Sequence, residues 1–320
     1  MLETGRPWEV VVLAAGRTAT IKLVGDSTET RVNKETLPGG PALRRWVRQV
    51  RAHHAQSRRA MAGEPDDFWR PHVTFFRQDP YRPPDPALAA VLRHVGPEDT
   101  VLDVGGGAGR FALPLTLRCR QVTVVEPSAS MVEALEAGRQ EAGIENLAVV
   151  RSTWEEAQVP AHDVVLCAHV LYGIERVDLF VKKLVEHARR RLLILMFMEA
   201  PVNAFDRAWR LVRRERRVGL PGIGLLLPVL WELGLYPDLE MVQQAPPRPF
   251  PSRDVALEAL KLRLYILPGS PEEARLLRLF SRLVEPASDG FRLRGVPPRW
   301  EGLLVWPPPR VGLDKTSPSY

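Results

Sequence analysis

Short runs of β-branched and aliphatic residues recur through the middle of the chain, and stretches with helical periodicity separate them. Apolar runs of this length, bounded by turn signals, are typical of strands buried on both faces of a parallel sheet. Strands that alternate with helices predict βαβ units. We therefore expect an α/β fold with a doubly wound, mostly parallel sheet. The runs lie at 99–104, 121–126, 146–151, 162–172 and 191–198.

The first of these strands ends in an acid, Asp103, and a glycine-rich turn that leads into a helical segment at 111–118. Glycines let the backbone turn sharply and let a ligand approach it closely. The spacing differs from the G-x-G-x-x-G pattern of dinucleotide sites, because Arg110 occupies the sixth position counted from Gly105. Asp103 would repel a pyrophosphate but suits a cationic or amine-bearing ligand. A glycine turn without a ligand is the alternative.

The segment from Asp103 to Gly109 resembles the first motif of the class I S-adenosylmethionine-dependent methyltransferases. The resemblance implies a Rossmann-like sheet of seven strands, of which the seventh is antiparallel, and S-adenosyl-L-methionine as the cofactor. It also implies that this turn binds the amino-acid end of the cofactor. The residues expected to bind there are Asp103, Gly105, Gly106, Gly107 and Gly109.

The second strand also ends in an acid, Glu126, and Pro127 follows it before a helix. An acid about 20 residues beyond the glycine turn hydrogen-bonds ribose hydroxyls in α/β nucleotide sites. The resemblance gives this role to Glu126, with Pro127 beside it in the cofactor site. An NAD-binding protein would use an acid here equally well, so Glu126 alone does not distinguish the two.

The loop after the third strand departs from the family pattern. In the family this loop commonly carries an acid beside an apolar residue, and together they hold the adenine. Here Ser152 and Thr153 stand where the acid is expected. We expect Thr153 to contact the cofactor and the face of Trp154 to cover the adenine ring. An ordinary core tryptophan is the alternative.

The fourth strand resembles the fourth motif of the family, whose end faces both cofactor and acceptor. We expect Cys167 and Ala168 to border the cofactor. His169 and Tyr172 follow at once and are the candidate catalytic residues, since a hydroxyl acceptor needs a general base. For His169, a structural role in bonding a loop backbone is the alternative.

The acceptor is expected to be a small molecule with an oxygen, nitrogen or sulfur nucleophile. No Asn-Pro-Pro-Tyr or Asp-Pro-Pro-Tyr follows the fourth strand, and no Pro-Cys pair is present there. Methylation of exocyclic base amines, of glutamine side chains or of pyrimidine C5 is therefore disfavoured. Two alternatives stay open: an RNA methyltransferase, and a non-catalytic protein that keeps the cofactor fold as a binding or assembly module.

The N-terminal flank predicts two appendages. Residues 1–40 alternate in strand fashion between 8 and 32, which predicts a β-meander of three short strands. Residues 41–85 predict an amphipathic helix, followed by an aromatic and proline-rich cap segment. The polar face of that helix carries many arginines, which could meet RNA phosphates or simply face solvent. The apolar face is expected to hold Leu43, Trp46, Val47, Val50, His54 and Met61.

The remaining chain predicts the cofactor-binding domain, 86–306, and a disordered tail, 307–320. Within the domain, residues 201–235 predict a helical cap over the acceptor side. The sixth and seventh strands are expected at 238–242 and 302–306. A helical insertion, 250–290, separates them.

Composition adds modest constraints. The 320 residues are 45% hydrophobic, which suits one core with appendages, and the net charge of +6 permits a nucleic-acid partner without requiring one. The two cysteines, Cys119 and Cys167, predict reduced thiols in a cytoplasmic protein, and no zinc spacing is present. We expect no metal, no signal peptide and no membrane partner; the uncharged run at 218–231 is too short to cross a bilayer.

Overall fold

The computed structural model describes residues 10–15, 18–23, 39–61, 63, 66–244, 249–296 and 299–306. The chain divides into two units, Met1–Gly39 and Gly40–Tyr320. In the first unit, β1 (Val10–Ala15) pairs antiparallel with β2 (Thr18–Leu23). The third strand of the predicted meander and the predicted tail, 307–320, lie outside the described residues.

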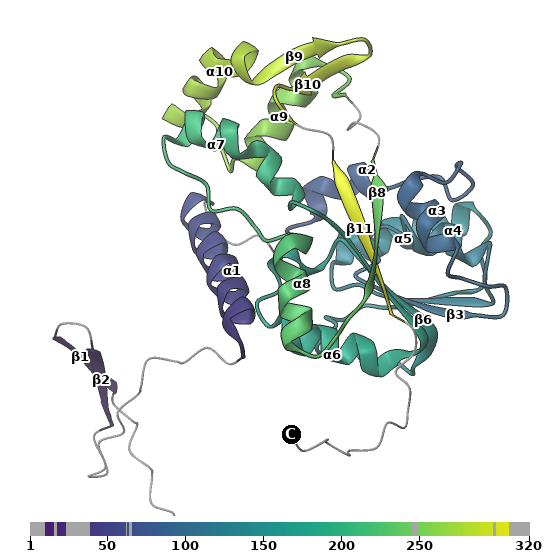
Figure 1. Ribbon diagram of the computed structural model, residues 1–320. Coiled ribbons are helices and arrows are strands. Elements are labelled where there is room, and N and C mark those ends of the chain that lie inside the picture. The colour runs from purple at the N-terminus through teal and green to yellow at the C-terminus, as the bar shows by residue number, and fades with distance from the viewer. Residues whose placement is uncertain are drawn as a thin grey trace, which may run out of the picture. The chain divides into compact units, whose positions relative to one another are not determined.

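A seven-stranded sheet forms the centre of the second unit, in the order β5-β4-β3-β6-β7-β11-β8 (Figure 1). The strands from β3 to β7 are parallel, whereas β11 runs antiparallel to both β7 and β8. The prediction of a doubly wound, mostly parallel sheet with an antiparallel seventh strand is confirmed. The strands are β3 (Thr100–Val104), β4 (Gln121–Val125), β5 (Leu147–Val150), β6 (His162–Ala168), β7 (Ala188–Phe197), β8 (Asp238–Gln243) and β11 (Trp300–Trp306).

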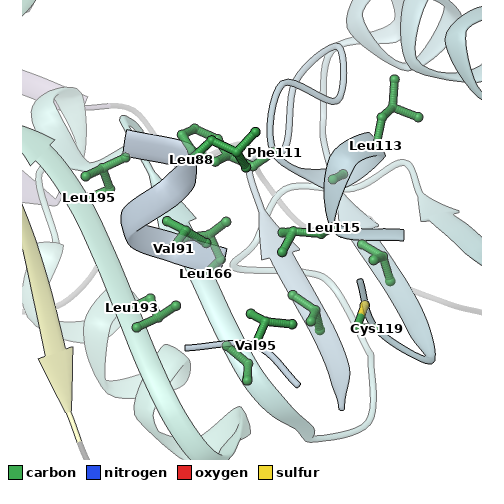
Figure 2. Close-up of a cluster of buried hydrophobic side chains, with 14 of the residues drawn as sticks. Leu88, Val91, Val95, Phe111, Leu113, Leu115, Cys119, Leu166, Leu193 and Leu195 are labelled. Carbon is green, nitrogen blue, oxygen red and sulfur yellow. The ribbon is translucent and has the colours of Figure 1, made fainter. Parts of the chain in front are cut away.

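Helices cover both faces of this sheet. On one face, α3 (Pro86–Leu92), α4 (Ala112–Thr116) and α5 (Ala129–Glu141) enclose the main core with the strands (Figure 2). α8 (Ile223–Glu232) packs on the other face. The contact is close at Gly302 of β11, where a Cβ would lie 2.5 Å from Ile223 Cδ1. α6 (Val177–His187) links β6 to β7 and packs on both strands.

A second, smaller core lies among the helices that follow β7. It is built by α7 (Asp206–Arg213), α9 (Arg253–Arg263) and α10 (Pro271–Leu283). The helices predicted within 201–235 and 250–290 are therefore present. The end of the predicted helical insertion, 250–290, differs from the prediction, because the segment after α10 forms a hairpin of β9 (Val284–Ala287) and β10 (Gly290–Leu293). Its Asp289-Gly290 dipeptide is a recognised hairpin signal.

The helix predicted after residue 40 is α1 (Pro41–Ala60), with Leu43, Trp46 and Val47 buried as expected. Its C-terminal half differs from the prediction, since His53 and Gln56 are buried whereas His54 is half-buried. The cause is a polar contact with residues 216–218. Gln56 Nε2 donates to Arg216 O at 2.9 Å, and Val218 N donates to Gln56 Oε1 at 2.7 Å. Buried polar side chains are tolerated where they satisfy a backbone in this way.

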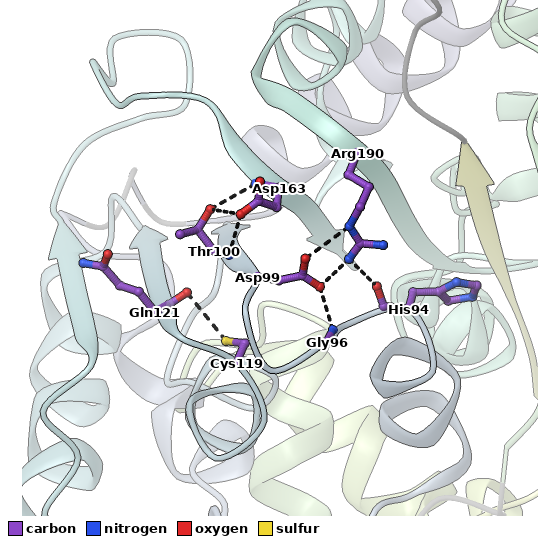
Figure 3. Close-up of polar contacts among 8 residues, drawn as sticks. All are labelled: His94, Gly96, Asp99, Thr100, Cys119, Gln121, Asp163 and Arg190. Atoms are coloured by element: carbon purple, nitrogen blue, oxygen red, sulfur yellow. Dashed lines mark hydrogen bonds and ion pairs between the residues drawn. The ribbon is translucent and has the colours of Figure 1, made fainter.

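Polar contacts also fasten the amino ends of the central strands (Figure 3). Thr100 donates to Asp163 through its backbone N and its Oγ1, at 2.9 and 2.7 Å. Asp99, just before β3, pairs with Arg190 of β7. The two cysteines are buried and unpaired. None of the described helices combines the length and the apolar character that a bilayer crossing requires.

Candidate cofactor and acceptor site

The glycine turn after β3 adopts a backbone that only glycine accommodates well. Gly105 and Gly109 have φ values of +72° and +84°. A Cβ at Gly105 would lie 2.4 Å from Val170 Cγ2, and one at Gly109 would lie 2.5 Å from Leu135 Cδ1. By contrast, a Cβ at Gly107 would meet nothing closer than Met131 Sδ at 4.0 Å. The turn is thus packed tightly on the protein side and leaves space above Gly107.

Asp103 lies beneath this turn and is 1% exposed. Its Oδ2 is buried and has no hydrogen-bond partner among the described residues. Burial, together with the nearby Glu126 carboxylate, raises the pKa of Asp103 to about 7. The Ala112 backbone hydrogen-bonds to the carboxylate, but a buried oxygen without a partner is unfavourable, and an ammonium group would satisfy it. The side chain is therefore suited to a positively charged amine.

Glu126 closes the other side of the turn. Its Oε2 accepts a hydrogen bond from Gly107 N at 3.0 Å, and its Oε1 accepts one from Ser128 N at 2.9 Å. Burial raises the pKa of Glu126. Each oxygen has a further lone pair, so the carboxylate can accept two hydroxyl groups in addition. Pro127 follows as an exposed residue at the entrance to α5.

Asp67 of the cap segment, which was not among the predicted site residues, contacts the amino end of α5 beside Glu126. Ser128 Oγ donates to both Asp67 oxygens at 3.0 Å, and Ser130 N donates to Asp67 Oδ2 at 3.0 Å. Burial acts to raise the pKa of Asp67, but these hydrogen bonds outweigh it and lower the pKa to about 2. The charge of Asp67 therefore stays at the amino end of α5, which favours an anion.

The loop after β5 places its two candidates differently. Thr153 Oγ1 donates to Glu156 Oε2 at 3.1 Å near the surface. Trp154 is buried against α6, where its Nε1 donates to Phe180 O at 3.3 Å and Lys183 Nζ lies 4.7 Å from the ring centroid. These contacts correspond to the alternative of a core tryptophan. Contact of Thr153 and Trp154 with a cofactor stays a prediction.

The end of β6 lies beside the glycine turn, as expected for the fourth motif. Cys167 is fully buried, and burial together with the Asp103 carboxylate raises the pKa of its thiol well above the ordinary value. Ala168 is half-buried and borders the main core. The thiol of Cys167 is therefore uncharged and is not activated as a nucleophile. That Cys167 and Ala168 border a cofactor stays a prediction.

His169 and Tyr172 belong to a buried polar chain that ends at Glu301 of β11. His169 Nδ1 lies 3.1 Å from Tyr172 Oη. His169 Nε2 and Glu301 Oε1 lie 3.4 Å apart, and both are buried without a hydrogen-bond partner among the described residues. Tyr172 Oη in turn accepts a hydrogen bond from Phe197 N at 2.7 Å. The ring of His169 therefore faces side chains, whereas its backbone N donates to Leu195 O at 2.8 Å and its φ is +62°.

Burial keeps the imidazole of His169 neutral. Burial lowers the pKa of His169 to about 3 and raises the pKa of Glu301 to about 7. Glu301 is 0% exposed, and its Oε2 accepts a hydrogen bond from Gln244 Nε2 at 2.8 Å. Glu301 was not among the predicted site residues, although it is a single acid in the apolar run 300–306 and could have been recognised by that pattern.

A cavity of about 380 Å³ opens beside this chain, at the carboxyl end of β7. Its lining includes Phe197, Arg207, Arg299 and Trp300. The ring of Phe197 stacks on His169 with centroids 4.8 Å apart, so it separates the cavity from the histidine by one side chain. The arrangement offers a space for a molecule close to His169 and Tyr172.

Comparison with known proteins finds similarity in the part of the chain that holds the glycine turn. Residues 101–192 match the protein family described as a methyltransferase domain. An uncharacterized protein of Haemophilus influenzae is 26% identical over 153 residues, which cover 47% of this chain and 56% of that protein. Ubiquinone biosynthesis O-methyltransferase of Rickettsia canadensis is 34% identical over 90 residues, 28% of this chain and 38% of that enzyme. The chain thus spans little more than half the length of these relatives, or less.

Solved structures with a similar outline include the YcgJ protein of Bacillus subtilis, with a TM-score of 0.46 and 17% identity over 68% of this chain and 96% of that chain. Another is coclaurine N-methyltransferase bound to N-methylheliamine and SAH, with a TM-score of 0.45 and 14% identity over 83% of this chain and 88% of that chain. The family match covers the glycine turn, Glu126 and the end of β6. Residues 101–192, which hold most of the parallel part of the sheet, therefore match a methyltransferase domain.

Proposed function

We propose that the protein transfers a methyl group from S-adenosyl-L-methionine to a small-molecule acceptor. The observation that carries this proposal is the buried, unpartnered Oδ2 of Asp103 beneath a glycine turn that leaves space above Gly107. The amino-acid end of the cofactor has an ammonium group, which would be the missing hydrogen-bond partner of Asp103 Oδ2. Glu126, which has lone pairs to spare, would hold the ribose hydroxyls. When bound, the cofactor supplies an electrophilic methyl group on a sulfonium.

The chain's own residues then have two tasks: to orient the acceptor and to manage its proton. Orientation alone accounts for on the order of 7–11 kcal/mol of barrier reduction in favourable cases. A neutral His169 can take the proton of a hydroxyl acceptor at Nε2, the ring nitrogen without a hydrogen-bond partner among the described residues, and the Glu301 carboxylate 3.4 Å away would stabilise the resulting imidazolium. Tyr172, which Phe197 N holds in place, fixes the ring of His169 from the other side.

The proposal is tested with purified protein, labelled methyl donor and a cell extract separated into RNA, protein and metabolite fractions. We expect label in the metabolite fraction. Label confined to RNA would favour the RNA methyltransferase alternative, and no label in any fraction would favour the non-catalytic alternative.

The exposed arginines of α1 give the RNA alternative its structural basis and a direct test. Arg45 and Arg48 are exposed on the polar face of α1. On the small-molecule proposal, the double variant Arg45→Glu and Arg48→Glu retains the wild-type rate of transfer to metabolites, because solvated charges on this face do not touch the acceptor. A filter-binding titration at two salt concentrations provides the comparison. RNA affinity that falls steeply with salt in the wild type and disappears in the variant would contradict the small-molecule assignment.

A further inference from the structure

A second cavity, of about 430 Å³, lies between the cap segment, the loop before α8 and the carboxyl end of α9. In Figure 1, α7 and α9 lie together beyond the first residues of β11 and the last residues of β8. The cavity walls come from sequence positions that are far apart: Phe68 and His72 from the cap, Arg217 from the loop, and Arg263 and Ile266 around the end of α9.

The acids of this cavity are already engaged. Asp67 accepts hydrogen bonds from Ser128 and Ser130, as described above. Glu258 pairs with Lys261, whose Nζ lies 2.9 Å from Glu258 Oε1 and 2.7 Å from Glu273 Oε1. Lys261 is therefore neutralised twice over. The acids that line the cavity have partners other than its two arginines.

Arg217 and Arg263 are different, because neither has a hydrogen bond or an ion pair within the part of the chain that the structure describes. Arg217 is 6% exposed, and both of its Nη atoms are buried without a hydrogen-bond partner. Its guanidinium lies 4.7 Å from the centroid of the Trp209 ring, and Asp206 acts on it only at longer range. A desolvated guanidinium without a partner is unfavourable.

Further unpartnered groups gather at the same place. His72 is 2% exposed, and its Nδ1 has no partner among the described residues. Burial and then the charge of Arg263 lower the pKa of His72 to about 4, so the ring is a neutral hydrogen-bonding group. Burial lowers the pKa of Arg263 as well, and Arg299 of the first cavity contributes to that shift. The positive charge of this cavity therefore continues through Arg263 to Arg299 of the first cavity, which lies beside the polar group of His169, Tyr172 and Glu301.

We infer that this cavity binds the anionic group, a carboxylate or a phosphate, of the small molecule that accepts the methyl group. Two guanidinium groups that have no hydrogen bond or ion pair to an acid among the described residues provide the charge, and His72 provides a neutral donor. Phe68, Pro71 and Ile266 provide an apolar wall for the body of the ligand. That the ligand is the acceptor rests on the proposed methyl transfer, whereas anion binding in the cavity does not.

Calorimetry with matched aromatic probes tests the inference in the absence of any methyl donor. Benzoate and phenyl phosphate carry the two anionic groups on one ring, and benzylamine carries the opposite charge at neutral pH. We expect one of the two anions to bind and benzylamine not to bind. Whichever anion binds more tightly identifies the group as carboxylate or phosphate. Binding of benzylamine as tight as that of both anions, or no binding of either anion, would overturn the inference.

Arg217→Gln should weaken binding of the anion by about tenfold or more, as expected for the loss of a charge-assisted hydrogen bond. Arg216→Gln is the matched control, because Arg216 is the exposed neighbour and does not line this cavity. Equal loss in both variants would point to the charge of the whole loop and contradict a site built on Arg217.

Arg217→Met separates ligand binding from a structural role. If the guanidinium awaits a ligand, an apolar side chain of similar length should raise the melting temperature of the ligand-free protein and abolish binding of the anion. If Arg217 serves only its contact with Trp209 and its longer-range attraction to Asp206, the melting temperature should fall. Titration of the same variants with S-adenosyl-L-methionine keeps the two proposals apart, since retained cofactor binding without anion binding would sink this inference alone.

Discussion

Asp103→Asn is expected to weaken binding of S-adenosyl-L-methionine by at least about thirtyfold. The estimate follows from the loss of one partner of a buried charge pair, which costs about 2–5 kcal/mol. Asparagine keeps the shape of the side chain, so the fold should be retained. Isothermal titration calorimetry measures the affinity, and Asp238→Asn, at an exposed position of β8, is the control. Unchanged affinity in Asp103→Asn would refute the cofactor assignment.

The same carboxylate makes cofactor binding depend on pH. Because the pKa of Asp103 in the folded protein is about 7, the affinity for a cationic amine should rise as the pH increases through 7 and the carboxylate ionises. Stability should move in the opposite sense. The folded-state pKa lies above the ordinary value of 3.8, so the folded protein holds a proton that the unfolded chain releases, and stability falls between about pH 4 and pH 7.

Asp103→Asn should reduce this loss of stability without removing it, because Glu301 has a raised pKa of the same sign. Thermal melts of wild type and variant between pH 4 and pH 8 measure the difference. A variant whose melting temperature follows the wild-type pH dependence throughout would show that Asp103 is ionised over the whole range.

His169→Asn is expected to lower kcat for a hydroxyl acceptor by about a hundredfold or more, the usual contribution of a general base. Asparagine is the appropriate replacement, because it tolerates the left-handed backbone conformation of residue 169 better than most residues. Cofactor affinity should change little, since His169 has no contact with Asp103 or Glu126 among the interactions described above. A variant with wild-type kcat would assign His169 a structural role.

Glu301→Gln tests whether Glu301 acts through His169. Its carboxylate ionises with a pKa of about 7, whereas the pKa of His169 is about 3. With the cofactor at saturating concentration, so that the ionisation of Asp103 does not limit binding, the rate should therefore rise with pH through about 7 in the wild type, and this rise should vanish in Glu301→Gln. A merely structural glutamate would leave the shape of the pH–rate profile unchanged. Gln244→Leu, which removes the hydrogen-bond donor of Glu301 Oε2, should shift the midpoint of the profile to higher pH.

The sheet and the first half of the site could be predicted because their signals are local. A buried parallel strand reads as one apolar run, and an acid followed by glycines at its end marks the turn directly. Asp103, Gly107, Glu126 and Cys167 therefore lie together, as the parallel strand order requires. Trp154 shows the limit of a local signal, since its packing on α6 depends on a helix more than twenty residues away.

The second half of the site depends on long-range placement that no local pattern records. Glu301 meets His169 because β11 is antiparallel, which brings its first residues to the edge where the parallel strands end. Asp67 reaches α5 from a cap segment that has no periodic pattern of its own. The burial of His53 in place of His54 follows from a polar contact between α1 and residues 216–218, whereas the amphipathic pattern counts only apolar side chains.

The position of β11 between β7 and β8 has a consequence for how the protein is made. β8 is synthesised more than fifty residues before β11, its only neighbour among the described strands of the sheet. β8 therefore stays unpaired until β11 inserts between β7 and β8. Since the inserting strand also carries Glu301, the proposed proton-accepting pair of His169 and Glu301 is complete only after β11 has joined the sheet. A nascent chain halted before residue 299 would then contain the glycine turn and Glu126 but would lack Glu301 beside His169.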